Sequence, residues 1–128
     1  MSPEISLLGV KEIREIANEL ELIPSKGLGQ NFVHDSNTCE KIVRLAGVGE
    51  GEEVVEIGPG LGSLTLALLR SGAHVTAVEI DKRLASRLPV TLIEHGAAKE
   101  SFKVLAKDAM DLMTSEIPDG AQLVANLP

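Results

Sequence analysis

The 128-residue sequence predicts an α/β fold built on a parallel sheet. Short apolar runs alternate with segments of helical periodicity, which is the pattern of strand–helix–strand units. The first run leads without a spacer into glycines at every second position, and a polar residue ends or follows each later run. Because the carboxyl ends of parallel strands meet at one edge of a sheet, we expect these residues to lie together there.

One helix is expected near the start of the chain, over residues 7–21. Its apolar positions are Val10, Ile13, Ala17 and Leu20. Spacings of three and four residues, with charges between them, predict one buried stripe. Pro24 ends this helix, because proline cannot continue it, and residues 25–29 form a connector.

A second helix is expected to follow, with Asp35, Ser36 or Asn37 as its cap. Its apolar positions are Cys39, Ile42, Val43 and Ala46. Cys39, the single cysteine, therefore falls on the buried side, and we interpret it as a buried thiol and not as a nucleophile. One cysteine also excludes a disulfide within the chain.

The central feature is the apolar run 54–57 followed by Gly58, Gly60 and Gly62. Gly58 and Gly60 permit backbone angles that a Cβ forbids and leave no side chain in the path of a ligand. Gly62 lets the next helix, over residues 63–71, pack tightly on the strand. The amino end of that helix directs amides and a positive dipole at the loop. A tight strand-to-helix turn without a ligand is the alternative interpretation.

Glu79 is the second expected ligand contact. It ends the strand-like run 73–79, and the second strand of a doubly wound sheet lies beside the first, with its carboxyl end facing the glycine loop. A carboxylate accepts hydrogen bonds from both hydroxyls of a ribose with its two oxygens. We therefore predict that Glu79 binds a ribose. A solvated carboxylate at a strand end is the alternative.

A helix is expected to start at Asp81, and Pro89 is expected to break or restart it. Its inward positions are Leu84, Ala85 and Leu88. Residues 102–106 then predict a third strand, which is followed by a helical turn through Met113.

The fourth strand is predicted over residues 122–125. Asp108 stands just past the third strand and Asn126 just past the fourth, although each is also a suitable helix cap. Together with the glycine loop and the carboxylate of the second strand, these residues place a candidate contact after every strand. This arrangement predicts a binding crevice at the carboxyl edge of the sheet.

Composition and the start of the chain suggest the setting. The chain has 19 acidic and 12 basic residues, and a net charge of −7 argues on its face against a nucleic-acid partner. The first four residues carry none of the basic residues of a signal peptide, and no apolar run is long enough to span a membrane. These features predict a cytoplasmic protein without a membrane partner, and the sequence predicts no metal site.

The third glycine separates two classes of ligand. A dinucleotide fingerprint, G-x-G-x-x-G, would need glycine at position 63, where the sequence has Ser63. The pattern present, E-x-G-x-G-x-G from Glu56 to Gly62, resembles motif I of methyltransferases that use S-adenosylmethionine. In those enzymes the loop passes the amino-acid part of the cofactor.

Motifs along nearly the whole chain resemble those of the small-subunit ribosomal RNA adenine N6-dimethyltransferases. The matching segments are 28–32 (LGQNF), 56–62 (EIGPGLG), 78–81 (VEID), 108–109 (DA) and 126–128 (NLP). Segment 29–32 is the most specific, because generic methyltransferases lack it. The resemblance implies a Rossmann-like class I methyltransferase fold with a seven-stranded sheet in the order 3-2-1-4-5-7-6. The chain would supply the first four strands of this sheet, preceded by two helices.

The resemblance also implies roles for single residues. The cofactor-binding residues would be Asn31, Val33, Gly58, Gly60, Glu79, Asp108 and Asn126, and the catalytic residues Asn126, Leu127 and Pro128. Asn31 and Val33 would contact the methionine part of the cofactor, and Asp108 the amine of its adenine. The Asn126 side chain and the Pro128 carbonyl would accept hydrogen bonds from the two N–H groups of the target amine. Four other polar residues, His34, Cys39, Glu56 and His74, are interpreted as structural.

The implied reaction is methyl transfer from S-adenosyl-L-methionine to the N6 amine of adenines in 16S ribosomal RNA, which gives N6,N6-dimethyladenosine during ribosome maturation. Large-subunit methyltransferases of the erythromycin-resistance type share much of this plan and remain an alternative. A non-catalytic cofactor-binding module is another.

The aromatic residue that follows Pro128 in the family has no counterpart in the sequence, nor do the remaining strands and the helical domain that helps grip RNA. We therefore expect an N-terminal half, in which residues 1–48 form a helical segment with the Gln-Asn-Phe motif and residues 49–128 half of the methyltransferase domain. The fragment is expected to be inactive alone and to self-associate through its exposed fourth strand. The complete enzyme would act on the immature 30S subunit.

Overall fold

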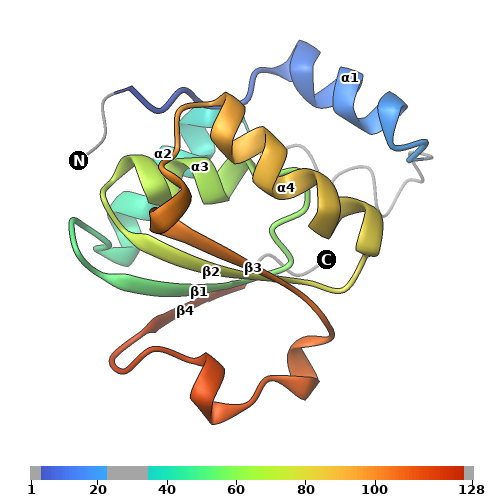
Figure 1. The fold of residues 1–128 in the computed structure, drawn as a ribbon. Helices are drawn as coiled ribbons and strands as arrows, with labels where there is room; N and C mark the ends of the chain where they lie inside the picture. The colour runs from blue at the N-terminus through green and yellow to red at the C-terminus, as the bar shows by residue number, and fades with distance from the viewer. Residues whose placement is uncertain (1–3, 23–34, 126–128) are drawn as a thin grey trace.

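A computed structural model describes residues 4–22 and 35–125 of the chain (Figure 1). Its centre is a four-stranded parallel sheet in the order β3-β2-β1-β4. The strands are β1 (Glu53–Ile57), β2 (His74–Glu79), β3 (Phe102–Ala106) and β4 (Gln122–Ala125). The expected parallel α/β sheet and the order of its first four strands are therefore confirmed.

The register of the sheet aligns the carboxyl ends of the central strands. Ile57, the last residue of β1, lies opposite Val78 on β2 and Ala125 on β4. The last residue of β2, Glu79, lies opposite Ala106 on β3. The segments that leave these strands therefore start from one edge of the sheet.

Two connecting helices cover one face of the sheet, α3 (Ser63–Arg70) after β1 and α4 (Lys82–Glu94) after β2 (Figure 1). All residues of α3 except the last are buried, as its apolar sequence predicts. Asp81 caps α4, because its carboxylate accepts the amide of Arg83 at 2.8 Å.

The expected break of α4 at Pro89 is wrong, since the helix runs through this residue to Glu94. Proline removes one backbone hydrogen bond from a helix. Here Leu88 and Leu92 are both buried, on either side of the proline. Burial of this apolar stripe in the core offsets the lost bond and holds the two halves of the helix in line.

Two helices precede the sheet, as expected: α1 (Val10–Glu19) and α2 (Ser36–Ala46). Of the three candidate caps of α2, Asp35 is the one that acts, because its carboxylate accepts the amide of Thr38 at 2.7 Å. Cys39 is fully buried on the side of α2 that packs against α3.

The buried stripe expected for α1 is wrong at its first position. Val10 is 50% exposed, and the buried residues of the helix are Ile13 and Ile16. Val10 is the first residue of the helix, and Ile5 and Leu8 of the segment before it are buried in the core instead. The face of α1 that points to the core therefore contains Ile13 and Ile16.

Polar contacts attach α1 to α4, beside which it lies in Figure 1. Arg87 of α4 forms an ion pair with Glu19 at 2.5 Å. At the other end, His95 follows α4 and lies with its Nε2 2.6 Å from a carboxylate oxygen of Glu12. Its Nδ1 lies 3.0 Å from the backbone carbonyl oxygen of Ser6. The N-terminal segment is thus tied to a residue more than eighty positions later.

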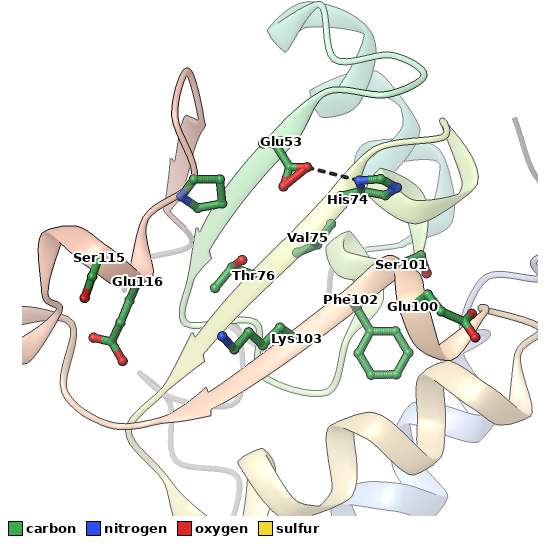
Figure 2. A pocket seen from close by; sticks show the side chains of 11 residues that line it. Glu53, His74, Val75, Thr76, Glu100, Ser101, Phe102, Lys103, Ser115 and Glu116 are labelled. Carbon is green, nitrogen blue, oxygen red and sulfur yellow. Dashed lines mark hydrogen bonds and ion pairs between the residues drawn. The ribbon is translucent and has the colours of Figure 1, made fainter.

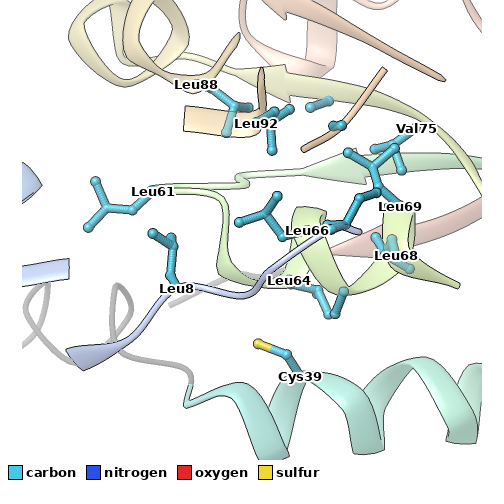
Figure 3. Close-up of a cluster of buried hydrophobic side chains, with 14 of the residues drawn as sticks. Leu8, Cys39, Leu61, Leu64, Leu66, Leu68, Leu69, Val75, Leu88 and Leu92 are labelled. Carbon is cyan, nitrogen blue, oxygen red and sulfur yellow. The ribbon is translucent and has the colours of Figure 1, made fainter. Parts of the chain in front are cut away.

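The core lies between the sheet and the helices and is aliphatic (Figure 3). The largest fully buried apolar side chains are leucines, namely Leu66, Leu68, Leu88 and Leu92. Phe102 packs at the margin of this cluster and is only partly buried. In the part of the chain that the structure describes, no helix has the length and apolar character needed to cross a membrane.

The other face of the sheet is crossed by the connection between β3 and β4 (Figure 1). It holds two 3-10 turns, η3 (Ala109–Asp111) and η4 (Thr114–Glu116), instead of the one helical turn expected. Apolar side chains remain exposed on this connection and on β4: Met110, Met113, Ile117 and Leu123. The second face is therefore less completely covered than the first.

Candidate functional site at the carboxyl edge of the sheet

The glycine loop starts where β1 ends, and its three alternate glycines all have positive φ angles. These are 73° at Gly58, 61° at Gly60 and 104° at Gly62. This region is costly for residues with a Cβ, which explains why the sequence uses glycine at each position. The Gly58 amide donates to the carbonyl of Val78 at 2.9 Å and so keeps the start of the loop beside β2.

Gly62 is also required by packing. A Cβ at this position would lie 2.8 Å from Cδ1 of Leu88 on α4, closer than real side chains approach. Gly62 is the residue before α3, so its lack of a side chain lets the loop and α4 approach each other. The sequence predicted close packing of the following helix, α3, on the strand, whereas the close contact found at this glycine is with α4.

Glu79 joins the glycine loop to the end of β2. Its Oε1 accepts the amide of Gly60 at 3.2 Å, and its Oε2 accepts the amide of Asp81 at 2.9 Å. The residue is only 5% exposed, so the alternative of a solvated strand-end carboxylate is wrong. Each carboxylate oxygen has a second acceptor position. Glu79 can therefore hold the loop and still accept hydrogen bonds from a ligand.

Glu56 is a buried acid close in sequence to the glycine loop, and its surroundings were not predicted from the sequence. It is fully buried on β1, two residues before Gly58. Its Oε1 accepts the hydroxyl of Thr65 at 2.5 Å, whereas its Oε2 has no hydrogen-bond partner among the described residues. Burial and, to a smaller extent, the charge of Glu79 raise the pKa of Glu56 to about 7, against the lowering effect of the Thr65 bond. The signal in the sequence was an acid inside an apolar strand.

Asp108 follows β3 closely, as predicted, and caps η3. Its carboxylate accepts the amide of Met110 at 2.9 Å. The alternative interpretation as a helix cap is thus realised. It leaves the carboxylate further acceptor positions, so capping and ligand binding are compatible.

Cys39 behaves as the buried thiol that the sequence indicated. Burial, the charge of Glu56 and those of two acids near its own helix raise the pKa of the thiol to about 11. A thiol with a raised pKa is a poor nucleophile near neutral pH. Cys39 is therefore excluded as a reactive group.

A hollow of about 310 Å³ lies away from this edge (Figure 2). It is lined by the first residues of β1, β2 and β3, together with η4. Its clearest polar contact is between Glu53 and His74, at 3.0 Å. A ligand there would lie at the amino ends of the strands, opposite the glycine loop, so we do not assign the hollow to the predicted site.

The structure brings together Gly58, Gly60 and Glu79 by direct hydrogen bonds within the loop and strand ends. Five other predicted site residues, Asn31, Val33, Asn126, Leu127 and Pro128, lie outside the described residues. Within the described ranges 4–22 and 35–125, no three His, Cys, Asp or Glu side chains are arranged to hold a metal ion.

Sheet order and glycine loop together define a Rossmann-like methyltransferase fold. Two solved structures share it. A dimethyladenosine transferase from Plasmodium falciparum matches with a TM-score of 0.62 and 28% identity, over 72% of this chain and 32% of that one. The 23S rRNA methyltransferase ErmE matches with a TM-score of 0.59 and 29% identity, over 73% of this chain and 36% of that one.

The family model described as ribosomal RNA adenine dimethylase matches residues 24–128. The chain therefore belongs to this family, as the sequence motifs indicated. Ribosomal RNA small subunit methyltransferase A of Corynebacterium jeikeium is 58% identical over 130 residues, which cover 98% of this chain and 41% of that protein. The chain thus spans about two fifths of the length of the curated relatives it matches.

Proposed function

We propose that the chain carries the cofactor-binding elements of an enzyme that transfers methyl groups from S-adenosyl-L-methionine to N6 of adenines in small-subunit ribosomal RNA. The product would be N6,N6-dimethyladenosine in 16S ribosomal RNA of the immature 30S subunit. Membership of the adenine dimethylase family supports the reaction. The observation that carries the proposal is the bond between Gly60 and Glu79, which joins the two parts of the proposed nucleoside-binding crevice.

The residues present fit this cofactor. The loop has no dinucleotide spacing for a pyrophosphate, and the buried Oε2 of Glu56 beneath it has no partner among the described residues. A crevice that has buried carboxyl groups and lacks the glycine spacing for a pyrophosphate suits a ligand with a ribose and a positively charged ammonium group. We assign the ribose to Glu79, the adenine amine to Asp108, and the methionine part to Gly58, Gly60 and the segment with Asn31 and Val33. Asn126 is assigned to the cofactor as well as to the target base.

Bound S-adenosylmethionine supplies a methyl group on a sulfonium sulfur. The chain's own contribution is positioning, which can account for a large part of a transfer barrier. We assign two hydrogen-bond acceptors for the amino group of the target adenine: the side-chain oxygen of Asn126 and the backbone carbonyl of Pro128. Leu127 lies between them in the sequence. This arrangement would turn the nitrogen lone pair toward the methyl group without a strong base.

Methyl incorporation from labelled cofactor into immature small subunits tests the reaction. The complete gene product should label adenine N6, and Asn126→Ala should lose most of the label while cofactor binding stays measurable. We expect the 128-residue chain alone to be inactive, because it spans only about two fifths of the length of its curated relatives. Turnover by that chain comparable to the complete product would contradict this assignment.

Two alternative functions are a large-subunit methyltransferase and a non-catalytic cofactor-binding module. A large-subunit methyltransferase has some support from the likeness to ErmE at 29% identity. The curated relatives at 50 to 58% identity are named small subunit methyltransferases, which favours the small subunit. Labelling of large-subunit RNA only would support the first alternative. Cofactor binding without labelling of either subunit by the complete gene product would support a non-catalytic module.

Two finer proposals follow from the substrate and from the sheet. We propose a cytoplasmic location, because that is where immature 30S subunits are found.

We also propose that the 128-residue chain self-associates. β4 is an edge strand of the described sheet, and Leu123 on it is 67% exposed. An edge with unpaired amides and an apolar side chain favours pairing between molecules.

A further inference from the structure

Glu56 is the one buried acid near the glycine loop to which the proposed function gives no role. It has no exposed surface, and β1 presents it on the same face of the sheet as the core residue Val54. Thr65, in the first turn of α3, donates to its Oε1 at 2.5 Å. The carboxyl group thus lies between the sheet and the amino end of the helix that follows the loop.

Two buried polar atoms, one on β1 and one at the start of α3, lack partners among the described residues. They are Oε2 of Glu56 and Oγ of Ser63, the first residue of α3. Buried polar atoms are nearly always hydrogen-bonded, so an unpartnered pair calls for a missing partner. Because Ser63 directly follows the glycine loop, a ligand in the loop is the nearest candidate.

Among the residues that the structure describes, no positively charged side chain faces Glu56. From β2 the facing titratable group is Glu79, which is itself acidic, and from α2 it is Cys39, a thiol with a raised pKa. From α3 the contact is the neutral hydroxyl of Thr65, and on β4 the register partner is Val124. Burying an unpaired carboxylate in such surroundings is costly, whereas the protonated acid is tolerated.

We propose that Glu56 carries a proton in the unliganded protein and releases it when the ammonium group of the cofactor's amino-acid part binds at the glycine loop. The O–H bond of the acid breaks, its proton passes to the solvent, and the carboxylate pairs with the arriving cation. This inference rests on the proposed function, and it makes Glu56 a proton-linked binding residue and not only a structural one.

The raised pKa of about 7 gives the size of the expected effect. If binding keeps the acid ionised, the protein should release most of a proton per bound cofactor at pH 6 and roughly half of one at pH 7. Apparent cofactor affinity should then fall about tenfold per pH unit below 7. Above about pH 8 the affinity should fall again, because the α-amino group of the cofactor loses its proton there.

Calorimetry in buffers of different ionisation enthalpy measures this proton release directly. The complete gene product is titrated with S-adenosylmethionine, with S-adenosylhomocysteine, which keeps the ammonium but not the sulfonium, and with 5′-methylthioadenosine, which has neither. Release with the first two and none with the third is expected. Release with all three, or with S-adenosylmethionine alone, would overturn the assignment to the ammonium group.

Two variants and one spectrum complete the test. Glu56→Gln retains an acceptor for Thr65 and should abolish proton release, whereas Glu53→Gln, on the same strand at the other end, should leave it unchanged. Infrared difference spectra of the unliganded wild type should show a carboxylic acid lost on cofactor binding, which requires no variant to fold. Tight cofactor binding without proton release would overturn this inference alone. Failure to bind S-adenosylmethionine and S-adenosylhomocysteine would overturn the proposed function as well.

Discussion

The two ends of the parallel sheet differ in what they offer a ligand. The amino ends surround an open hollow, in which Glu53 already pairs with the side chain of His74. The carboxyl ends carry the glycine loop, where the amide of Gly60 donates to the buried carboxylate of Glu79. The hollow at the amino ends and the bonded glycine loop at the carboxyl ends are thus different kinds of surface. Directed backbone groups and a buried, incompletely bonded acid distinguish a binding site from a surface depression.

The largest expected effect comes from filling the space at Gly62. Gly62→Val should destabilise the protein by about 3 kcal/mol or more, because φ is 104° there and the new side chain would collide with Leu88. Denaturant unfolding measures the change. The matched control at the other end of the sheet is Gly49→Val, where a Cβ meets nothing within 4 Å. If both variants unfolded at the wild-type denaturant concentration, the tight packing at the carboxyl end would be disproved.

The buried acid should make stability depend on pH. The pKa of Glu56 is raised to about 7 from its ordinary value of 4.5, so the folded protein binds more protons than the unfolded chain between these values. The wild type should therefore lose about 3 kcal/mol of unfolding free energy relative to Glu56→Gln as pH rises from about 4 to 8. Parallel stability curves for the two proteins would contradict this expectation.

Removing the bridging carboxylate should weaken cofactor binding. Glu79→Ala is expected to cost about 1.5–3 kcal/mol of binding free energy, the usual scale for hydrogen bonds to a charged group. Glu53→Ala, at the amino ends, should leave the affinity unchanged. Titration calorimetry compares the two variants. An unchanged affinity for Glu79→Ala would mean that Glu79 does not bind the ribose.

The smallest expected effect concerns the edge strand β4. Leu123→Lys should weaken self-association of the 128-residue chain by about 1 kcal/mol, because charge on an edge strand discourages pairing. Sedimentation at several concentrations measures the association, and amide exchange over residues 122–126 reports whether the strand stays ordered. A strictly monomeric wild-type chain with those amides strongly protected would show that something other than a second copy covers the edge.

Much of the fold was predictable because its signals are local. The third and fourth strands occupy the residues expected, and the caps Asp35 and Asp81 were both candidates from side-chain chemistry. The prediction of a helix break at Pro89 was wrong because helix propensity takes no account of the burial of Leu88 and Leu92 on either side of the proline. Tertiary packing decided that case.

The candidate site was predictable in position and less so in its interactions. Spacing placed Glu79 near the glycine loop, and the bond to Gly60 agrees. The same reasoning left Glu56 as structural, because an unpartnered oxygen is a property of the packed interior and not of the sequence. The contact between His95 and Glu12 was missed for a similar reason, since the two residues are 83 positions apart.

The central claim is that the carboxyl edge of the sheet binds S-adenosylmethionine and not a dinucleotide. Titration of the complete gene product with S-adenosylmethionine, S-adenosylhomocysteine and NAD tests it most directly. Because the loop has Ser63 where a dinucleotide fingerprint needs glycine, we predict that both sulfur-containing ligands bind and that NAD does not. Tighter binding of NAD than of S-adenosylmethionine would contradict the account.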